Sequence, residues 1–358
     1  MRPVVLCYGT RPQVIKASVV RRLLMEAGPV VAVDTGQHYD YELNALLYAQ
    51  LDVSPPDHCL DVGSASHGVQ TAAILERTEG FLRGFGAGAV VVIGDTNSTL
   101  GAALAAAKLR IPVVHVEAGL RACDGLMAEE INRRAVDSFA RLLCTPSAAA
   151  TARMQSERPD AQIVETGDVA RDVLESQLAR LPSIDRIRPA GAADFIFATL
   201  HRAELTEDPS VLTQVLETLA SLDRPVLMAM HPRTHAALEG HGLGAGSRGT
   251  LTIMPAVGYH ESLALTRAAS AVITDSGGVQ REAYWLGTPC VTIRTETEWL
   301  ETLAAGANRL VPPEAISTLP DHLAKALGAP AWDRDAYGTG NAGRQVADAT
   351  AALAGWTG

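Results

Sequence analysis

The sequence predicts an α/β protein with two open, doubly wound parallel sheets, one in each of two domains. Short apolar, β-branched runs alternate with helical segments along its 358 residues. Runs that are apolar on both sides are typical of parallel strands covered by helices. The pattern starts twice, first at Val4 and again at Phe195. A chain of this length also exceeds what a single core usually holds.

The clearest strands are predicted from these apolar runs. The first series covers Val4–Tyr8, Val30–Asp34, Ala89–Ile93 and Val113–Val116, and the second covers Phe195–Thr199, Val226–Met230, Ala271–Thr274 and Cys290–Ile293. Helices are expected over Ser18–Ala27, Thr99–Leu109, Glu129–Ala140 and Val279–Leu286. We place a Rossmann-like domain at residues 1–172 and another at 173–338, with ligands in the cleft beyond the carboxyl ends of the strands.

Composition and charge argue against several classes of protein. The net charge of -10 is unfavourable for a nucleic-acid partner, because phosphate backbones need a basic footprint. The sequence shows no apolar segment long enough to span a bilayer and no signal peptide, so we expect a cytoplasmic protein without membrane contact. The five cysteines form no CxxC pair and are interpreted as small buried side chains in a reducing compartment.

The turn after the first strand favours a diphosphate over a dinucleotide cofactor. It reads GTRP at Gly9–Pro12, and the GxGxxG pattern of dinucleotide folds is absent there. Arg11 and Lys16 lie near the start of the next helix, where a bidentate fork and a point charge suit a diphosphate. A solvated helix face is the alternative interpretation of these two charges, but their position at the carboxyl end of a strand favours a functional role. We expect no redox cofactor.

A stronger nucleotide signal lies in the second domain, at Thr274–Glu282. Gly277 and Gly278 allow close approach of a ligand to the backbone, and Ser276 can offer both its hydroxyl and its N–H group. The helix that follows points the positive end of its dipole at an anion. Glu282, one turn into that helix, can accept hydrogen bonds from both ribose hydroxyls.

Three acidic segments of the first domain predict acid–base chemistry. Asp95 and Glu117 follow neighbouring strands, and the pair Glu129–Glu130 opens a helix. Carboxylates that converge at strand ends can have the shifted pKa values that acid–base catalysis needs. A metal site is the alternative, and nearby arginines make it less favourable for a hard cation. One member of the glutamate pair is expected to be only an N-terminal helix charge.

Two histidines follow adjacent strands of the second domain, at His201-Arg202 and His231-Pro232. A single histidine is more often structural than catalytic. Two of them at neighbouring strand ends leave both interpretations open.

Through the segments that contain these residues, the sequence resembles the non-hydrolysing UDP-N-acetylglucosamine 2-epimerases over nearly its whole length. The matching stretches are GTRPQVIKAS, TGQHYD, GDTNSTLGAALAAAKLRIPVVHVEAGLR, EEINRR, HRAELTEDP, HPRT, TDSGGVQREAYWLGTPCVTIR and TEWLETLAAGAN. The wording is most similar to the branch that acts on UDP-2,3-diacetamido-2,3-dideoxy-glucuronate. The resemblance implies a GT-B architecture, with a C-terminal helix over residues 339–358 packed back on the first domain.

The resemblance also implies roles for individual residues. It assigns catalysis to Asp95, Glu117, Glu129 and His201. It assigns substrate and UDP binding to Arg11, Lys16, Arg133, Ser276, Gly277, Gly278 and Glu282. It assigns the binding of a second, activating UDP-sugar to Gln37, Arg202 and His231. Three positions depart from the family pattern. Ala128 replaces a proline and Leu205 an asparagine, which affects loop geometry, and Asp40 replaces a glutamine of activated members, which argues against the activator.

The resemblance implies inversion of C2 of a UDP-2-acetamido sugar, without metal or redox cofactor. The steps would be elimination of UDP to a 2-acetamidoglycal and re-addition, in a homodimer that serves polysaccharide biosynthesis. Two alternatives stay open: a GT-B glycosyltransferase that uses a UDP-sugar, and a UDP-sugar-binding sensor without activity.

Overall fold

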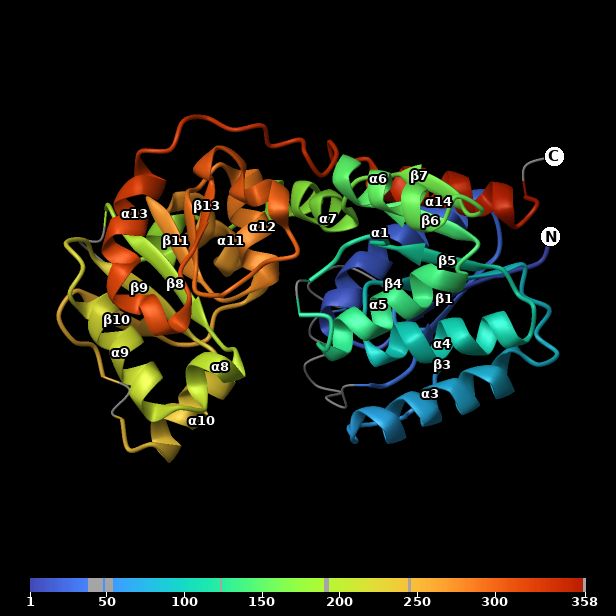
Figure 1. Cartoon of the computed structure of the whole chain (residues 1–358), viewed down its shortest axis with the longest axis horizontal. Helices are drawn as coiled ribbons and strands as arrows, with labels where there is room; N and C mark the ends of the chain where they lie inside the picture. Colours follow the sequence, from blue (N-terminus) through green and yellow to red (C-terminus); the bar gives the residue numbers. More distant parts are fainter. Residues whose placement is uncertain (38–47, 49–53, 123, 190–192, 244–245, 357–358) are drawn as a thin grey trace. The chain divides into compact units, whose positions relative to one another are not determined.

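The structure is a computed structural model, and it describes residues 1–37, 48, 54–122, 124–189, 193–243 and 246–356. The chain divides into two compact units (Figure 1). The first unit comprises Met1–Ser176 together with Ala336–Gly358, and the second unit comprises Gln177–Asp335. The first unit is therefore discontinuous in sequence, with the second inserted into it.

A seven-stranded parallel sheet forms the centre of the first unit, in the order β3-β2-β1-β4-β5-β6-β7. Its strands are β1 (Val4–Tyr8), β2 (Val30–Asp34), β3 (His58–Cys59), β4 (Ala89–Ile93), β5 (Val113–Val116), β6 (Leu142–Thr145) and β7 (Gln162–Glu165). Its helices are α1 (Arg11–Ala27), α3 (His67–Leu82), α4 (Asn97–Lys108), α5 (Ala128–Phe139), α6 (Ala148–Glu157), α7 (Val169–Gln177) and α14 (Ala342–Leu353). The strand order reverses direction between β1 and β4, which is where ligands bind in such sheets.

Helices cover both faces of this sheet. On one face α4 packs between α3 and α5, and on the other α14 packs beside α1 (Figure 1). Small side chains let α3 and α4 approach closely, since a Cβ atom at Gly101 would lie only 2.6 Å from Cγ2 of Ile74. β1 and β4 are buried along their whole length, as expected of central strands.

The C-terminal helix α14 belongs to the first unit. Asp172 caps its first turn, because its carboxylate accepts hydrogen bonds from the N–H groups of Ala342 (3.0 Å) and Gly343 (2.7 Å). After the helix, Trp356 covers Gly28 and donates from Nε1 to the carbonyl of Arg2 at 2.8 Å. The two ends of the chain are thus joined in one unit.

A six-stranded parallel sheet forms the centre of the second unit, in the order β10-β9-β8-β11-β12-β13. Its strands are β8 (Ile196–Leu200), β9 (Val226–Met230), β10 (Leu251–Met254), β11 (Ala271–Thr274), β12 (Cys290–Thr292) and β13 (Asn308–Leu310). Its α-helices are α8 (Ala203–Thr206), α9 (Pro209–Ala220), α10 (Pro232–Gly240), α11 (Tyr259–Ala268), α12 (Gly277–Leu286) and α13 (Leu319–Leu327). Short 3-10 helices lie at Leu178–Arg180, Ile184–Arg186, Leu300–Gly306 and Pro313–Thr318.

The predicted fold class is confirmed, with differences at several element ends. β8 is shifted by one residue from the predicted Phe195–Thr199, and β12 ends at Thr292 rather than Ile293. α1 begins at Arg11 rather than Ser18, because Thr10 and Gln13 form a capping box in front of it. Within the described part of the chain, no helix has the length and apolar character needed to cross a membrane.

Candidate functional site

Glu117, at the carboxyl end of β5, is the most constrained of the predicted catalytic carboxylates. Its backbone is left-handed (φ 68°), a conformation that costs a non-glycine residue energy and that clusters at functional sites. The side chain is 6% exposed and contacts Lys16, whose Nζ lies 2.6 Å from Oε1 and 2.7 Å from Oε2. Lys16 on α1 was predicted to bind a diphosphate; here its charge balances a buried carboxylate.

Asp95, after β4, and Glu130, on α5, share the buried guanidinium of Arg133. Glu130 is fully buried and also accepts hydrogen bonds from the N–H of Ala122 (2.9 Å) and from Nε of Arg134 (2.6 Å). Asp95 keeps about a third of its side chain exposed, at 30%. The arginine therefore leaves one carboxylate open to solvent and ties the other into the core.

The two glutamates that open α5 differ in their surroundings. Glu129 is exposed and makes no hydrogen bond or ion pair within the described residues, whereas Glu130 is the buried centre of several ion pairs. A carboxylate that holds a helix to a loop is not free to exchange protons with a ligand. Of the pair, Glu129 is the one whose side chain is open to solvent.

Backbone loops around these carboxylates are fixed by amide side chains. Gln13 donates from Nε2 to the carbonyl of Ile93 at 2.7 Å and accepts from the N–H of Gly9 at 3.0 Å, so it joins the GTRP turn to the end of β4. Asn132 donates to the carbonyl of Asp95 at 2.9 Å. Sequence reasoning did not single out either amide, because nothing in a lone Gln or Asn shows which carbonyl it will reach.

Two further predicted binding residues of the first unit are Arg11 and Gln37. Arg11 is exposed at the first position of α1. Gln37, predicted to bind an activator, is buried and accepts from the N–H and the hydroxyl of Ser98 at 2.9 and 2.6 Å. Asp40, on which the argument against an activator rested, lies outside the described residues.

The second unit presents a helix start at the end of β11. Ser276 is the N-cap of α12, and its hydroxyl accepts from the N–H of Val279 at 3.4 Å. A Cβ atom at Gly277 or Gly278 would meet no atom closer than 3.6 Å, and neither glycine has a positive φ. The fold itself therefore does not require glycine at these positions. Two glycines at the positive end of a helix leave room for an anion to reach the backbone N–H groups.

Glu282, on the same helix, is unusually basic for a carboxyl group. Burial raises its pKa from 4.5 to about 7, against the opposing effects of the Arg281 charge and of a hydrogen bond with the Tyr259 hydroxyl. That tyrosine begins α11. The carboxyl group therefore ionises near neutral pH. Ionisation increases its ability to accept hydrogen bonds from two hydroxyl groups.

His201, at the end of β8, is held by Asp275, the residue after β11. Oδ2 of Asp275 accepts from the N–H groups of His201 and Arg202, both at 2.7 Å, and Oδ1 lies 3.0 Å from Nδ1 of His201. Burial acts to raise the pKa of Asp275, but these hydrogen bonds and the charge of His201 hold it below the usual value. Nδ1 therefore faces the carboxylate, which directs Nε2 away from it.

His231 and Arg202, predicted for the activator, lie beside His201. The rings of His231 and His201 are 5.1 Å apart between centroids. His231 is exposed and caps α10, since its Nδ1 accepts from the N–H of Arg233 at 3.1 Å. The structure thus brings His201 and the two residues together in the second unit, while Gln37, assigned to the same activator, belongs to the first.

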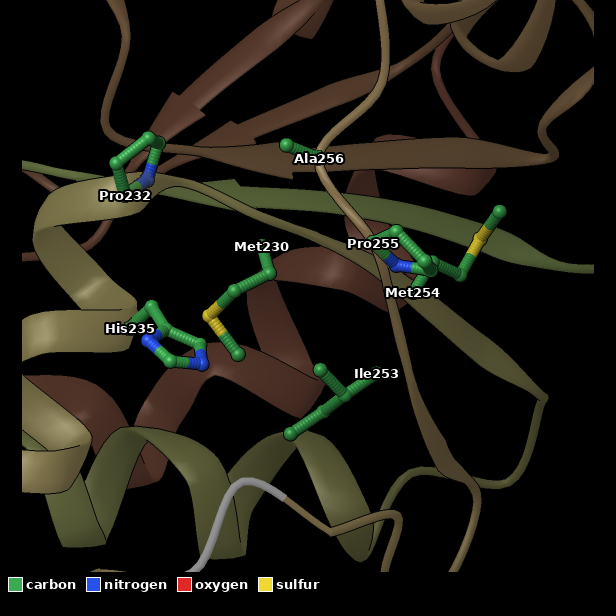
Figure 2. Close-up of a pocket in the computed structure, with 7 residues that line it drawn as sticks. All are labelled: Met230, Pro232, His235, Ile253, Met254, Pro255 and Ala256. Atoms are coloured by element: carbon green, nitrogen blue, oxygen red, sulfur yellow. The ribbon is translucent and has the colours of Figure 1, made fainter.

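An apolar pocket of 540 Å³ opens at the ends of β9 and β10 (Figure 2). It is lined by Met230, Pro232, His235, Ile253, Met254, Pro255 and Ala256. Figure 2 shows the side chains of Met230, His235 and Ile253 directed toward one another, while that of Met254 points away from His235. The lining residues are mostly apolar and include no lysine or arginine that could neutralise a diphosphate, so this pocket fits a flat, weakly polar group better.

Comparison with known proteins places this geometry in a family. Residues 26–351 match the family model described as UDP-N-acetylglucosamine 2-epimerase. The UDP-2,3-diacetamido-2,3-dideoxy-D-glucuronate 2-epimerase of Pseudomonas aeruginosa is 39% identical over 96% of this chain and 98% of its own length. The chain belongs to the UDP-N-acetylglucosamine 2-epimerase family. The resemblance predicted from the sequence motifs is confirmed, and the chain is an epimerase-type isomerase.

Other members of the family support the assignment along the whole chain. A UDP-N-acetylglucosamine 2-epimerase of Methanococcus maripaludis is 33% identical over 95% of this chain and 96% of its own. The crystal structure of the Methanocaldococcus jannaschii UDP-GlcNAc 2-epimerase in complex with UDP-GlcNAc and UDP superposes with a TM-score of 0.88 at 33% identity, covering 98% of this chain and 100% of that one. The GT-B architecture expected from the sequence is therefore observed.

The structure also identifies residues that sequence reasoning left without a role. Asp275 and Asp137 each hold a histidine, and Glu130 anchors Arg133. Asp275 stands in the TDSGG motif that drew attention to Ser276, so its position at a strand end was a usable signal. Within the described residues, no group of three or more His, Cys, Asp or Glu side chains is arranged to hold a metal ion.

Proposed function

We propose that this protein inverts C2 of a UDP-linked 2-acetamido sugar. The observation that carries the proposal is the set of carboxylates at the ends of β4 and β5 and at the start of α5, within a chain that is 39% identical to a 2-epimerase over 96% of its length. This reaction requires acid–base groups and hydrogen-bond donors that stabilise the departing diphosphate.

The reaction needs the departure of UDP because the C2 proton is barely acidic by itself. No carbonyl is adjacent to C2, so direct deprotonation at neutral pH is unfavourable. When the C1–O bond breaks and its electron pair leaves with UDP, positive charge develops on the ring. A base then takes the C2 proton, and the C–H electrons form the C1–C2 double bond of a 2-acetamidoglycal. UDP adds back to C1 while a proton reaches C2 from the other face.

We assign the acid–base chemistry to the first unit. Asp95, Glu117 and Glu129 supply the carboxylates that take and return protons and stabilise the cationic ring. Lys16 pairs with Glu117, since the ammonium group contacts both of its oxygens. A positive partner suits a carboxylate that must be ready as a base, whereas the exposed Glu129 is free to exchange protons with water.

We assign nucleotide binding to the second unit. The start of α12 binds the diphosphate through the N–H groups of Gly277 and Gly278, and Glu282 accepts from the ribose hydroxyls. His201, oriented by Asp275, directs Nε2 toward the departing diphosphate. We assign the uracil base to the apolar pocket beside Met230. Ala256 in the wall of this pocket lies three residues before Tyr259, whose hydroxyl hydrogen-bonds to Glu282.

Deuterium exchange tests the mechanism directly. In D₂O, UDP-N-acetylglucosamine and its 2,3-diacetamido-glucuronate analogue are supplied separately, and C2 is followed by NMR. The new epimer should carry deuterium at C2 from the first turnover, because the proton removed from one face is not the one delivered to the other. Epimer that retains its original C2 hydrogen would rule out elimination, and the preferred substrate identifies the branch.

The same assay distinguishes the alternatives. A glycosyltransferase should leave a UDP-sugar unchanged without an acceptor, and a sensor should bind it without turnover.

Activity should survive EDTA and need no added NAD, because the proposed steps transfer only protons and UDP. Loss of activity with EDTA, restored by a divalent metal, would contradict this reading.

We further propose that the protein acts as a homodimer. Val69 on α3 and Ile131 on α5 are exposed apolar residues, at 64% and 51%, beside an apolar groove between these helices. Apolar patches of this kind commonly mark protein interfaces. Sedimentation should give twice the chain mass of 37.7 kDa, and Ile131→Glu should shift it to the monomer. Wild-type protein that sediments as a monomer at micromolar concentration would contradict the dimer.

A further inference from the structure

A buried histidine lies on β5, two residues before Glu117. His115 is the third residue of β5 and has no exposed surface. Its Nδ1 lies 2.7 Å from Oδ1 of Asp137 on α5, and its Nε2 lies 2.8 Å from the carbonyl oxygen of Gly94. Asp137 is also buried, and its other oxygen accepts from Arg121 at 2.6 Å and from the N–H of Gly119 at 3.2 Å.

The chemistry of these partners determines the protonation of the ring. A carbonyl oxygen can only accept hydrogen bonds, and an ionised carboxylate can only accept as well. Burial acts to raise the pKa of Asp137, but hydrogen bonding and charge from His115, together with Arg121, outweigh it and hold that pKa below its usual value. Independently of the ring, the guanidinium of Arg121 and the N–H of Gly119 both donate to Oδ2 and favour the ionised form of Asp137. A neutral imidazole has one N–H group and would leave one nitrogen lone pair against an oxygen, so both contacts are satisfied only when both nitrogens carry protons.

The ring also connects two turns that carry proposed catalytic residues. Gly94, immediately before Asp95, is held on both sides: its N–H donates to the carbonyl of Val116 at 2.9 Å, and its own carbonyl accepts from His115. Gly119, two residues after Glu117, is held by Asp137. Both glycines have positive φ values, 68° and 83°. Without a fixed partner, such turns would have other conformations available.

We propose that His115 is a positioning residue, held doubly protonated by Asp137, that fixes the Gly94 carbonyl and thereby the place of Asp95. This inference rests on the proposed function for the role of Asp95. It differs from a simple packing role because it requires two ring donors, and a neutral side chain of similar size would not replace them. Figure 1 shows the two elements concerned, β5 and α5, in the first unit.

Nitrogen-15 NMR of the wild-type protein tests the protonation state without any variant. Histidine-labelled protein at near-neutral pH should show one imidazole with protons on both Nδ1 and Nε2, protected from exchange with water. His115→Gln assigns this signal by removing it, and His58→Gln, at an exposed histidine of β3, should leave it in place. A wild-type His115 ring with a single N–H group would overturn the proposal.

Kinetics and backbone NMR test the positioning role. In His115→Gln we expect kcat to fall about 10- to 100-fold, because a small displacement of a catalytic group is enough to cause such a loss. The Kd for UDP should be unchanged, and backbone signals of Gly94 and Asp95 should shift while those of Gly277 and Gly278 do not. Wild-type kcat in this variant, or a loss confined to UDP affinity, would overturn the proposal.

The same measurements separate this proposal from the proposed function. If the wild-type protein converts no UDP-sugar, the proposed function fails, yet the ring protons and the Gly94 and Asp95 signals still show whether His115 fixes this turn. Asp137→Asn provides a second variant, because a neutral amide cannot stabilise the charged ring. It should return His115 to a single N–H group; a ring that stays doubly protonated would contradict the role given to Asp137.

Discussion

The carboxyl edges of the two sheets differ in the side chains that follow their strands. At the first, charged side chains pair with one another: Lys16 with Glu117, and Arg133 with Asp95 and Glu130. At the second, the start of α12 is made of Ser276 and two glycines, and a Cβ atom on either glycine would meet no atom closer than 3.6 Å. The first edge holds its own charges in fixed positions, and the second leaves room for charges brought by a ligand.

Glycine shows the same difference between the two edges. At Gly9, in the first, a Cβ atom would lie 2.0 Å from Oγ1 of Thr35 and 2.3 Å from Oγ of Ser98, so packing within the protein requires glycine there. At Gly278, in the second, the nearest atom would be 3.7 Å away. A glycine in a motif can therefore serve the fold or serve a ligand, and only the surrounding atoms distinguish these roles.

The largest effect should come from neutralising carboxylates of the first edge. Asp95→Asn, Glu117→Gln and Glu129→Gln should each lower kcat by about 10²–10⁴-fold, the usual loss when a general acid or base is removed. Calorimetric titration should find the Kd for UDP unchanged, because the proposed nucleotide contacts lie in the other unit. Glu130→Gln is the matched control and should lower thermal stability. A fully active Glu129→Gln with a folded but inactive Glu130→Gln would reverse the assignment within the pair.

The two glycines should separate folding from binding. Gly278→Ala should keep wild-type thermal stability yet weaken UDP binding about tenfold or more, because the methyl group occupies the space proposed for the diphosphate. Gly9→Ala should instead lower the free energy of unfolding by about 1–3 kcal/mol through overpacking. Calorimetry and UDP titration of both variants give the comparison. Normal UDP affinity in Gly278→Ala would show that this helix start does not bind the diphosphate.

Glu282 should make UDP binding depend on pH. Its pKa is raised to about 7, so the carboxyl group ionises between pH 6 and about 8 and then accepts from both ribose hydroxyls. Affinity for UDP should rise over this range in the wild type and less in Glu282→Gln, which also corrects for titration of UDP itself. Glu282→Ala should weaken UDP binding more than it lowers kcat. Identical pH dependence in wild type and Glu282→Gln would remove the ribose role.

The same raised pKa has the opposite effect on stability of the ligand-free protein. The folded state favours the protonated carboxyl group relative to the unfolded chain. The contribution of Glu282 to the free energy of unfolding is therefore complete below pH 4.5 and is lost as the pH rises through about 7. Denaturant titration should show it as a fall in stability that Glu282→Gln lacks. A wild-type stability that rises over this range relative to the variant would contradict the sign.

The smallest effect is expected at the proposed activator residues. We expect hyperbolic dependence of rate on UDP-sugar concentration and little change in the curve's shape for His231→Ala. The sequence reason is the acidic residue Asp40, which would disfavour a second diphosphate. Initial rates over a wide concentration range provide the measurement. Sigmoidal kinetics in the wild type that become hyperbolic in His231→Ala would establish an activator site.

Periodicity predicted the central strands well because burial on both faces leaves a strong apolar signal. It missed short edge strands such as β3 and β13, of two and three residues, which are too short for a pattern. Motifs indicated where polar residues gather, since strand ends are visible in sequence. They could not show that Lys16 would pair with Glu117, because a salt bridge between residues 101 positions apart depends on the completed fold.

The return of α14 to the first unit has a consequence for synthesis on the ribosome. Gly343 on this helix packs where a Cβ atom would be 2.7 Å from Val19 and 2.9 Å from Leu23, so α14 covers an apolar face of α1. The ribosome makes α1 before the second unit, and α14 only after the entire second unit. That apolar face therefore stays uncovered while more than 300 residues are added, and a nascent chain stalled before residue 342 should bind chaperones that the released chain does not.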